Sequence, residues 1–212
     1  MRVCVPVHIH ARWRACKMTR ITLILTITQL LFACGQNTNS MDIIENRTDD
    51  KFELIYKPES STYSGNQLKI IPTEPNYEPS TEQQKEAIKY LTTEFSKNEI
   101  SSALTKNVEF IDSGENFESV SCNLCGLNID IDNWQEAMDK AFQTSFSDLS
   151  LLTPCCNKQT GLNDLEYDMP SGFSKYVIEV IDPDMSDNQK TDLIKNLTGI
   201  LGHDMKLIWA HY

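Results

Sequence analysis

The sequence has few of the features that mark the specialised structural classes. Its 212 residues include only 8 Gly and 8 Pro, without an internal repeat, which excludes collagen-like and low-complexity chains. The longest mostly apolar run, Ile21 to Phe32, is shorter than the ~20 residues of a membrane-spanning helix, so a multi-span membrane protein is excluded. The 40% hydrophobic content is that of a globular protein, and the length predicts one domain with an appended tail.

Basic side chains are scarce after residue 33. Five of the 19 Lys and Arg residues lie before that point, which leaves 14 basic residues against 30 acidic ones. Such a surface repels phosphate backbones, so no nucleic-acid partner is expected.

Familiar catalytic patterns are also missing from the sequence. It contains no H-E-x-x-H, no G-x-S-x-G, no P-loop and no G-x-G-x-x-G. Only His203 and His211 follow residue 33, so a nucleophile–histidine pair has few candidates. These absences favour a non-enzymatic binding or interaction module.

The N-terminal region predicts export. Lys17 and Arg20 precede the apolar run, as in the n- and h-regions of a secretory signal; a buried helix or strand is the alternative. The junction Leu31-Phe32-Ala33-Cys34-Gly35 resembles the lipobox of bacterial lipoproteins. The resemblance implies a signal peptide over 1–33, with Met18 as a second candidate start, and a lipidated Cys34. More than one acyl chain would then anchor the protein to a bacterial membrane, facing the periplasm or the exterior.

Composition divides the rest of the chain into three parts. Residues 34–51 are polar and predict a flexible tether behind the lipidated cysteine. Residues 52–78 predict an irregular lead-in with one short strand at 52–56, because prolines punctuate it and the start of the next part. Residues 79–212 are expected to form the domain.

Hydrophobic periodicity and turn residues predict the elements of that domain. Helices are expected at 80–95, 133–144 and 186–202, and strands at 108–111, 117–120, 149–152, 173–181 and 206–211. The second helix is expected to bury Trp134, Ala137, Met138, Ala141 and Phe142. The pattern predicts an α+β fold, with a small mixed, largely antiparallel sheet and helices on one face.

Four cysteines carry the sharpest chemical signal. Cys122 and Cys125 form a C-x-x-C-G corner after one predicted strand, and Cys155 and Cys156 follow another. Two such corners supply four thiolates for a tetrahedral zinc site, as in zinc ribbons. Adjacent cysteines can share a metal only in a turn, because neighbouring side chains of a strand point to opposite faces. If one points away, His203 or His211 could replace it.

Two other fates of these cysteines stay open. An exported protein meets oxidising conditions, so the four residues could form two disulfides. A periplasmic thiol–disulfide redox role for the C-x-x-C pair is the alternative function. It is disfavoured because Cys122 follows a strand and does not begin a helix.

A polar cluster lies after the cysteine pair. Asn163, Asp164 and Tyr167, together with the terminal His211, could form a binding patch. The alternative is a turn or helix cap with solvated charges.

Three segments together resemble a set of uncharacterised bacterial proteins. They are VEFIDSGENFESVSCNLCG, TPCCNKQTGLNDLEYDMPSGFSKYVIEVIDP and LGHDMKLIWAHY. The shared features are a C-x-x-C…P-C-C core, an LNDL-Y segment, a P-x-G-F turn and a terminal aromatic-H-Y, and they cover about 79–212. This chain has Asn123 where that set tends to have Pro.

The resemblance implies a cysteine-knuckle α+β domain and no specific activity. Together with the export signal it leads to one expected function, a lipid-anchored cell-envelope module, stabilised by structural zinc, that binds a protein partner. Neutralisation of a basic toxin is one specific form of that expectation.

Overall fold

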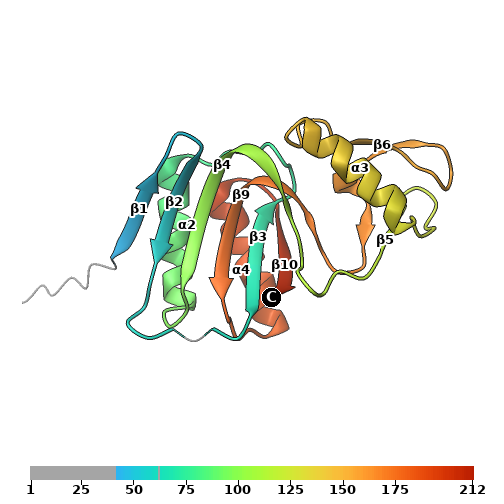
Figure 1. Cartoon of the computed structure of the whole chain (residues 1–212). Helices are drawn as coiled ribbons and strands as arrows, with labels where there is room; N and C mark the ends of the chain where they lie inside the picture. The colour runs from blue at the N-terminus through green and yellow to red at the C-terminus, as the bar shows by residue number, and fades with distance from the viewer. Residues whose placement is uncertain (1–41, 62) are drawn as a thin grey trace, which may run out of the picture. The chain divides into compact units, whose positions relative to one another are not determined.

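The computed structural model describes residues 42–61 and 63–212, and these form an α+β fold (Figure 1). One sheet has the order β1-β2-β4-β9-β3-β10, and two small sheets pair β5 with β8 and β6 with β7. All pairs of named strands in the described residues are antiparallel, as expected of a largely antiparallel sheet. The elements are β1 (Ile43–Arg47), β2 (Lys51–Tyr56), β3 (Asn66–Pro72), α2 (Thr81–Glu94), β4 (Ile100–Ile111), β5 (Val120–Ser121), α3 (Ile131–Gln143), β6 (Ser150–Leu152), β7 (Gln159–Gly161), a 3-10 turn (Leu162–Asp164), β8 (Glu166–Tyr167), β9 (Gly172–Ile181), α4 (Asp187–Leu201) and β10 (Met205–His211).

Local sequence signals explain where α2 and α4 begin and end. Ser80 and Ser186 each form a capping box with the glutamine three residues later, which satisfies free N–H groups of the first turn. Gly202 ends α4 in the left-handed conformation, at φ 70°. Both helices pack against the same core, and Figure 1 shows them behind the large sheet. The expectation of helices on one face is therefore confirmed for α2 and α4.

The main core lies between that sheet and α2 and α4. It joins strand residues such as Leu54, Ile70 and Ile178 to helix residues such as Leu91 and Leu197, all fully buried. Tyr176 is buried with them, and its hydroxyl bonds that of Ser102 at 3.0 Å, so this polar group is not left unpaired.

A second core lies in what we call the cysteine lobe, residues 112–171, which leaves the large sheet after β4 and returns at β9. Figure 1 shows its α3, β5 and β6 to one side of the large sheet. Val108 of β4 and Phe173 of β9 continue into this core, where they meet Val120, Cys122 and Leu162. The same two strands therefore carry residues of both cores.

The predicted tether and lead-in are wrong for the described residues from 43 onward. β1 and β2 form an antiparallel hairpin at one edge of the large sheet, and β3 lies inside the sheet between β9 and β10. β1 looks like a polar linker because an edge strand with exposed side chains needs no apolar alternation. The prolines end or follow the strands without interrupting them, with Pro58 after β2 and Pro72 closing β3.

Two local expectations in the domain are also corrected. The predicted hairpin of 108–111 and 117–120 does not form. The end of β4, which starts at Ile100, pairs with β9, and β5 pairs with β8. The side chain of Phe142 is 70% exposed at the end of α3, whereas Ala137 and Ala141 are buried as expected. The other expected strands and helices are confirmed within a few residues.

The proposed signal peptide, the start at Met18 and the lipidated Cys34 lie outside the described residues, so they stay predictions. None of the helices within residues 42–61 and 63–212 combines the length and hydropathy needed to cross a bilayer.

Truncating a side chain of β3 tests the correction of the lead-in. Leu68 is fully buried in the main core, so Leu68→Ala is expected to lower the free energy of unfolding by about 2–5 kcal/mol. Gln67→Ala, at the neighbouring partly exposed position, serves as the control. Urea denaturation followed by circular dichroism measures both. A loss below about 0.5 kcal/mol for Leu68→Ala would place residues 66–72 outside the core.

Candidate metal centre

The first cysteine turn begins where β5 ends. Cys122 donates its N–H to the carbonyl of Leu127 at 2.9 Å, and Gly126 donates its N–H to the carbonyl of Cys122 at 2.8 Å. Gly126 has φ +72°, a conformation that costs a side-chain-bearing residue energy. This tight turn aims the thiols of Cys122 and Cys125 to the same side, as the C-x-x-C-G spacing predicts.

The second cysteine turn joins β6 to β7. Thr153 donates its N–H to the carbonyl of Lys158 at 2.9 Å, and Asn157 donates its N–H to the carbonyl of Thr153 at 2.9 Å. Asn157 takes the left-handed position at φ +55°, which asparagine tolerates better than most residues. Cys155 and Cys156 thus lie in a turn, where adjacent cysteines can face one point.

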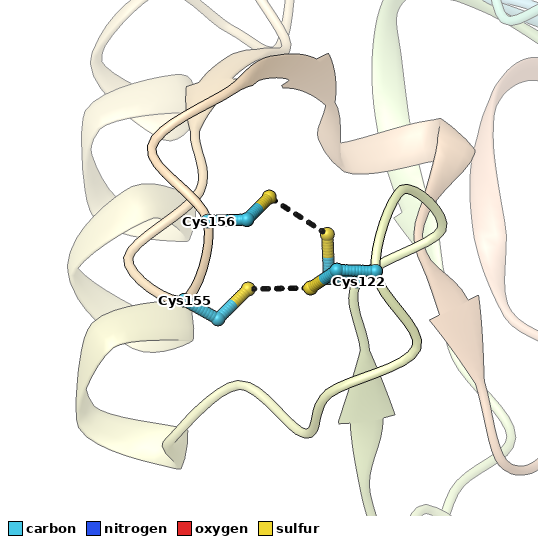
Figure 2. Close-up of side chains that lie close together, drawn as sticks. Cys122, Cys155 and Cys156 are labelled. Carbon is cyan, nitrogen blue, oxygen red and sulfur yellow. Dashed lines mark hydrogen bonds between the residues drawn. The ribbon is translucent and has the colours of Figure 1, made fainter.

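The two turns bring the four predicted cysteines together. Their sulfur atoms all lie within 4.8 Å of one another. Cys122 Sγ is 3.9 Å from Cys156 Sγ, and Cys125 Sγ is 3.4 Å from Cys155 Sγ. Figure 2 shows the sulfur atoms of Cys122, Cys155 and Cys156 turned toward one another.

These distances fit a shared metal ion. Four sulfurs placed about 2.3 Å from a central zinc are about 3.8 Å apart at the edges of the tetrahedron. A disulfide would need about 2.05 Å, and all four residues are free cysteines. No histidine belongs to the cluster within the described residues, so His203 and His211 are not needed as substitutes. The cluster is compatible with a metal site.

Burial and hydrogen bonding differ among the thiols. Cys122 is completely buried, whereas Cys125 is exposed. Burial raises the pKa of the Cys122 thiol, but the N–H of Leu124, 3.4 Å from its sulfur, and hydrogen bonds from neighbouring cysteines outweigh burial and lower that pKa to about 7.

The pKa of Cys125 moves in the opposite direction. The N–H of Leu127 lowers it, but the adjacent thiols, Cys155 foremost, together with burial, raise the pKa to about 12. Deprotonation of one sulfur therefore opposes deprotonation of its neighbour, because like charges so close together repel. A divalent cation among the four sulfurs removes this repulsion, so the electrostatics of the cluster favour metal binding.

The geometry bears on the alternative redox role. A thiol–disulfide enzyme presents a reactive, accessible thiolate at a helix N-terminus. Here the thiol with the lower pKa is buried, and the next helix, α3, begins only at Ile131. Four converging protein ligands also leave no open position of the kind that catalytic zinc uses.

Aromatic side chains pack against the core that contains Cys122 of the first cysteine turn. Trp134 of α3 stacks on Phe117 at 5.0 Å between ring centroids and meets Phe110 edge-on at 5.9 Å. Trp134 and Tyr167 pack against the core that contains Cys122. Trp134 is thus half-buried against the core, whereas its position on the predicted helix indicated full burial.

The predicted polar patch has separate structural roles in the fold. Asn163 accepts the N–H of Phe173 and donates to the carbonyl of Thr73, which ties the cysteine lobe to the large sheet. Tyr167 donates its hydroxyl to the carbonyl of Leu162, and burial raises its pKa to about 12. Asp164 ends the short 3-10 turn, and His211 ends β10 with Nδ1 3.1 Å from Asn66 Oδ1. A binding patch made of these four residues stays a prediction.

Sequence inspection missed one residue beside the sulfurs. Thr153 is buried, and its Oγ1 lies 3.1 Å from Cys156 Sγ. The signal was available in the spacing, because TPCCN matches CNLCG with threonine in place of the first cysteine.

No protein-family model, no curated protein and no solved structure matches the chain. The resemblance to bacterial proteins with a C-x-x-C…P-C-C core therefore stays a prediction.

Proposed function

We propose that the protein is a lipid-anchored module of the bacterial cell envelope that binds a protein partner and is stabilised by a structural Zn²⁺ on Cys122, Cys125, Cys155 and Cys156. The observation that carries the proposal is the convergence of four sulfurs within 4.8 Å from two tight turns. A donor set of four soft thiolates favours zinc, which takes four ligands tetrahedrally in structural sites. The lipid on Cys34 would supply the membrane attachment.

The surface of the cysteine lobe supports the binding role. Large apolar side chains are exposed around the turns and along α3, and these are Leu124, Leu127, Ile131, Phe142 and Leu152. A groove of about 200 Å³ runs between α3 and β6, lined by Ala137, Leu151, Leu152 and Pro154 with Glu136 and Lys140 at its rim. The apolar lining of this groove, with Leu152 exposed in it, fits an interaction site.

Charge indicates which partner the groove takes. The cysteine lobe, residues 112–171, carries 11 acidic and 2 basic side chains, and four zinc-bound thiolates would add two further negative charges. Such a surface attracts cationic proteins and repels anionic membranes and nucleic acids. The partner we propose is therefore a cationic protein whose contact surface includes apolar side chains.

Metal analysis tests the zinc site. In the full chain with Cys4, Cys16 and Cys34 replaced by serine, called the triple-serine chain, we expect about one zinc per chain. The four remaining thiols should react only after denaturation and chelation. Because metal binding displaces thiol protons, acidification should release the zinc.

Single substitutions in this background separate the metal site from the alternatives. Cys122→Ser is expected to abolish tight zinc binding and destabilise the lobe, because structural zinc contributes to folding. Leu124→Ala, at an exposed position of the same turn, should keep the metal. Absence of both zinc and free thiols in the triple-serine chain would indicate disulfides and favour the thiol–disulfide redox role instead.

Cell fractionation tests the anchor. The wild-type chain is expected in the membrane fraction and in the detergent phase of a Triton X-114 extraction, and Cys34→Ser should move it to the aqueous phase because the acyl chains are lost. Cys16→Ser, upstream of the predicted cleavage point, is the matched control and should change nothing. A Cys34→Ser chain that stays membrane-bound would contradict lipidation at this residue.

Site-directed photo-cross-linking tests the partner surface. A benzoylphenylalanine placed at Leu152 in the groove is expected to give one discrete adduct in cells, whereas the same residue at Ile44, exposed on β1, should not. The cross-linked protein should be basic, and its purified form should bind more weakly to Leu152→Glu and at higher salt. An adduct of equal yield at Ile44, or an acidic adduct protein, would contradict the proposal.

A further inference from the structure

The two cysteine turns have the same backbone. In each, the first residue donates its N–H to the carbonyl five residues later and accepts the N–H of the residue four positions later, at 2.8–2.9 Å in all four bonds. The fifth residue of each turn has positive φ, +72° at Gly126 and +55° at Asn157. The backbone therefore superposes Thr153 on Cys122 and Cys156 on Cys125.

This equivalence gives Thr153 an unusual place. Its counterpart in the first turn is Cys122, which supplies a sulfur and is completely buried, and Thr153 itself is only 1% exposed. In the second turn the other sulfur comes instead from Cys155, which corresponds to the non-ligand Leu124. Thr153 thus occupies a position that faces the metal centre without providing a thiolate.

The hydroxyl of Thr153 lies within hydrogen-bond distance of two acceptors, the carbonyl of Lys158 and the sulfur of Cys156. Its Oγ1 accepts the N–H of Lys158 at 3.1 Å and lies 3.0 Å from the carbonyl of Lys158 and 3.1 Å from Cys156 Sγ. A hydroxyl has one proton, so it can donate to the carbonyl or to the sulfur but not to both.

The ionised sulfur is the better acceptor. A hydrogen bond to a thiolate is charge-assisted, and the carbonyl of Lys158 still receives the N–H of Thr153 at 2.9 Å when the hydroxyl turns away. The N–H of Lys158 continues to donate to Oγ1 and polarises the O–H. The chain Lys158 N–H, Thr153 O–H and Cys156 sulfur therefore stabilises Cys156 as a ligand.

We propose that Thr153 is a positioning residue of the metal centre, and that its hydroxyl donates to the Cys156 thiolate from the place that Cys122 takes in the first turn. The proposal rests on the proposed metal site. Substitution of a residue that hydrogen-bonds a metal ligand typically lowers the metal affinity about 10–100-fold.

Metal titrations of the triple-serine chain test the role of the hydroxyl. Thr153→Val removes it at nearly constant volume and is expected to weaken zinc binding about 10–100-fold in chelator competition. With Co²⁺ as the probe, the sulfur-to-metal charge-transfer band should move to lower energy, because the thiolate loses a hydrogen bond. Thr153→Ser keeps the hydroxyl and should retain both the affinity and the band.

A matched control removes a different hydroxyl from the same lobe. Thr160 of β7 donates its hydroxyl to Asn123 Oδ1 at 3.0 Å, so Thr160→Val removes a contact between the first turn and β7 without removing a bond to sulfur. It should leave the cobalt spectrum unchanged. Thermal unfolding of the metal-free variants separates a loss of fold from a loss of metal affinity.

The backbone equivalence has its own test in a second pair of variants. Cys155→Leu is expected to lose tight zinc binding, and adding Thr153→Cys should restore it, because the pair rebuilds the second turn with the spacing of the first. This test does not depend on the fold tolerating valine at position 153.

Each outcome has one meaning. An unchanged band and affinity in Thr153→Val, equal losses in Thr153→Val and Thr153→Ser, or no rescue of Cys155→Leu by Thr153→Cys, would overturn the role of Thr153 and leave the metal site standing. Absence of zinc and cobalt binding by the triple-serine chain itself would overturn the metal site, and the role of Thr153 with it.

Discussion

The pairing of β4 with β9 is the constraint on which the rest of the structure depends. Ile100–Leu104 pairs with the second half of β9 inside the main sheet, and Glu109–Ile111 pairs with its first residues beside the cysteine lobe. Between these stretches residues 105–108 oppose the single residue Lys175, an irregularity that bends the ladder. One pair of strands therefore serves two cores, and the lobe of residues 112–171 has both ends held by the same ladder. The contacts of both cores therefore help to offset the conformational entropy that is lost when this one pair of strands is ordered.

Within the lobe, backbone geometry and electrostatics act on the same four sulfur atoms. Two turns with a left-handed residue, Gly126 and Asn157, fix where the thiols point, and their packing on the second core fixes how close they come. Burial raises the pKa of Cys122, but the N–H of Leu124 and the neighbouring cysteines outweigh burial and lower that pKa to about 7. A backbone N–H lowers the pKa of Cys125, but the adjacent thiols and burial outweigh it and raise that pKa to about 12. A protein that holds thiols this way gains stability from a cation at their centre, because the ion replaces mutual repulsion with four attractive contacts.

Much of the fold could be predicted because its signals are local. Ser80 and Ser186 begin helices through contacts with residues three positions away, and Gly202 ends one through its own φ. The prediction failed where partners are distant in sequence. The polar strand β1 is recognisable only by its pairing with β2, and β3 looked like an irregular segment because its place depends on β9 and β10, more than 100 residues away. Phe142 fits the apolar stripe of its helix, but it is 70% exposed and meets Phe146 edge-on at 5.8 Å between ring centroids.

The amino-acid sequence by itself determined the chemistry available to this protein: an acidic chain after residue 33 and two cysteine pairs in turn-forming contexts. It also determined the helix ends, because capping involves only neighbouring residues. The tertiary structure alone decided that all four sulfurs lie within 4.8 Å, that Cys122 is the buried one, and that Thr153 faces Cys156. The physical reason is that these properties depend on how the two cysteine turns, about 30 residues apart in the sequence, pack on a shared core. Such packing is a sum of many weak non-local contacts that no single stretch of sequence contains.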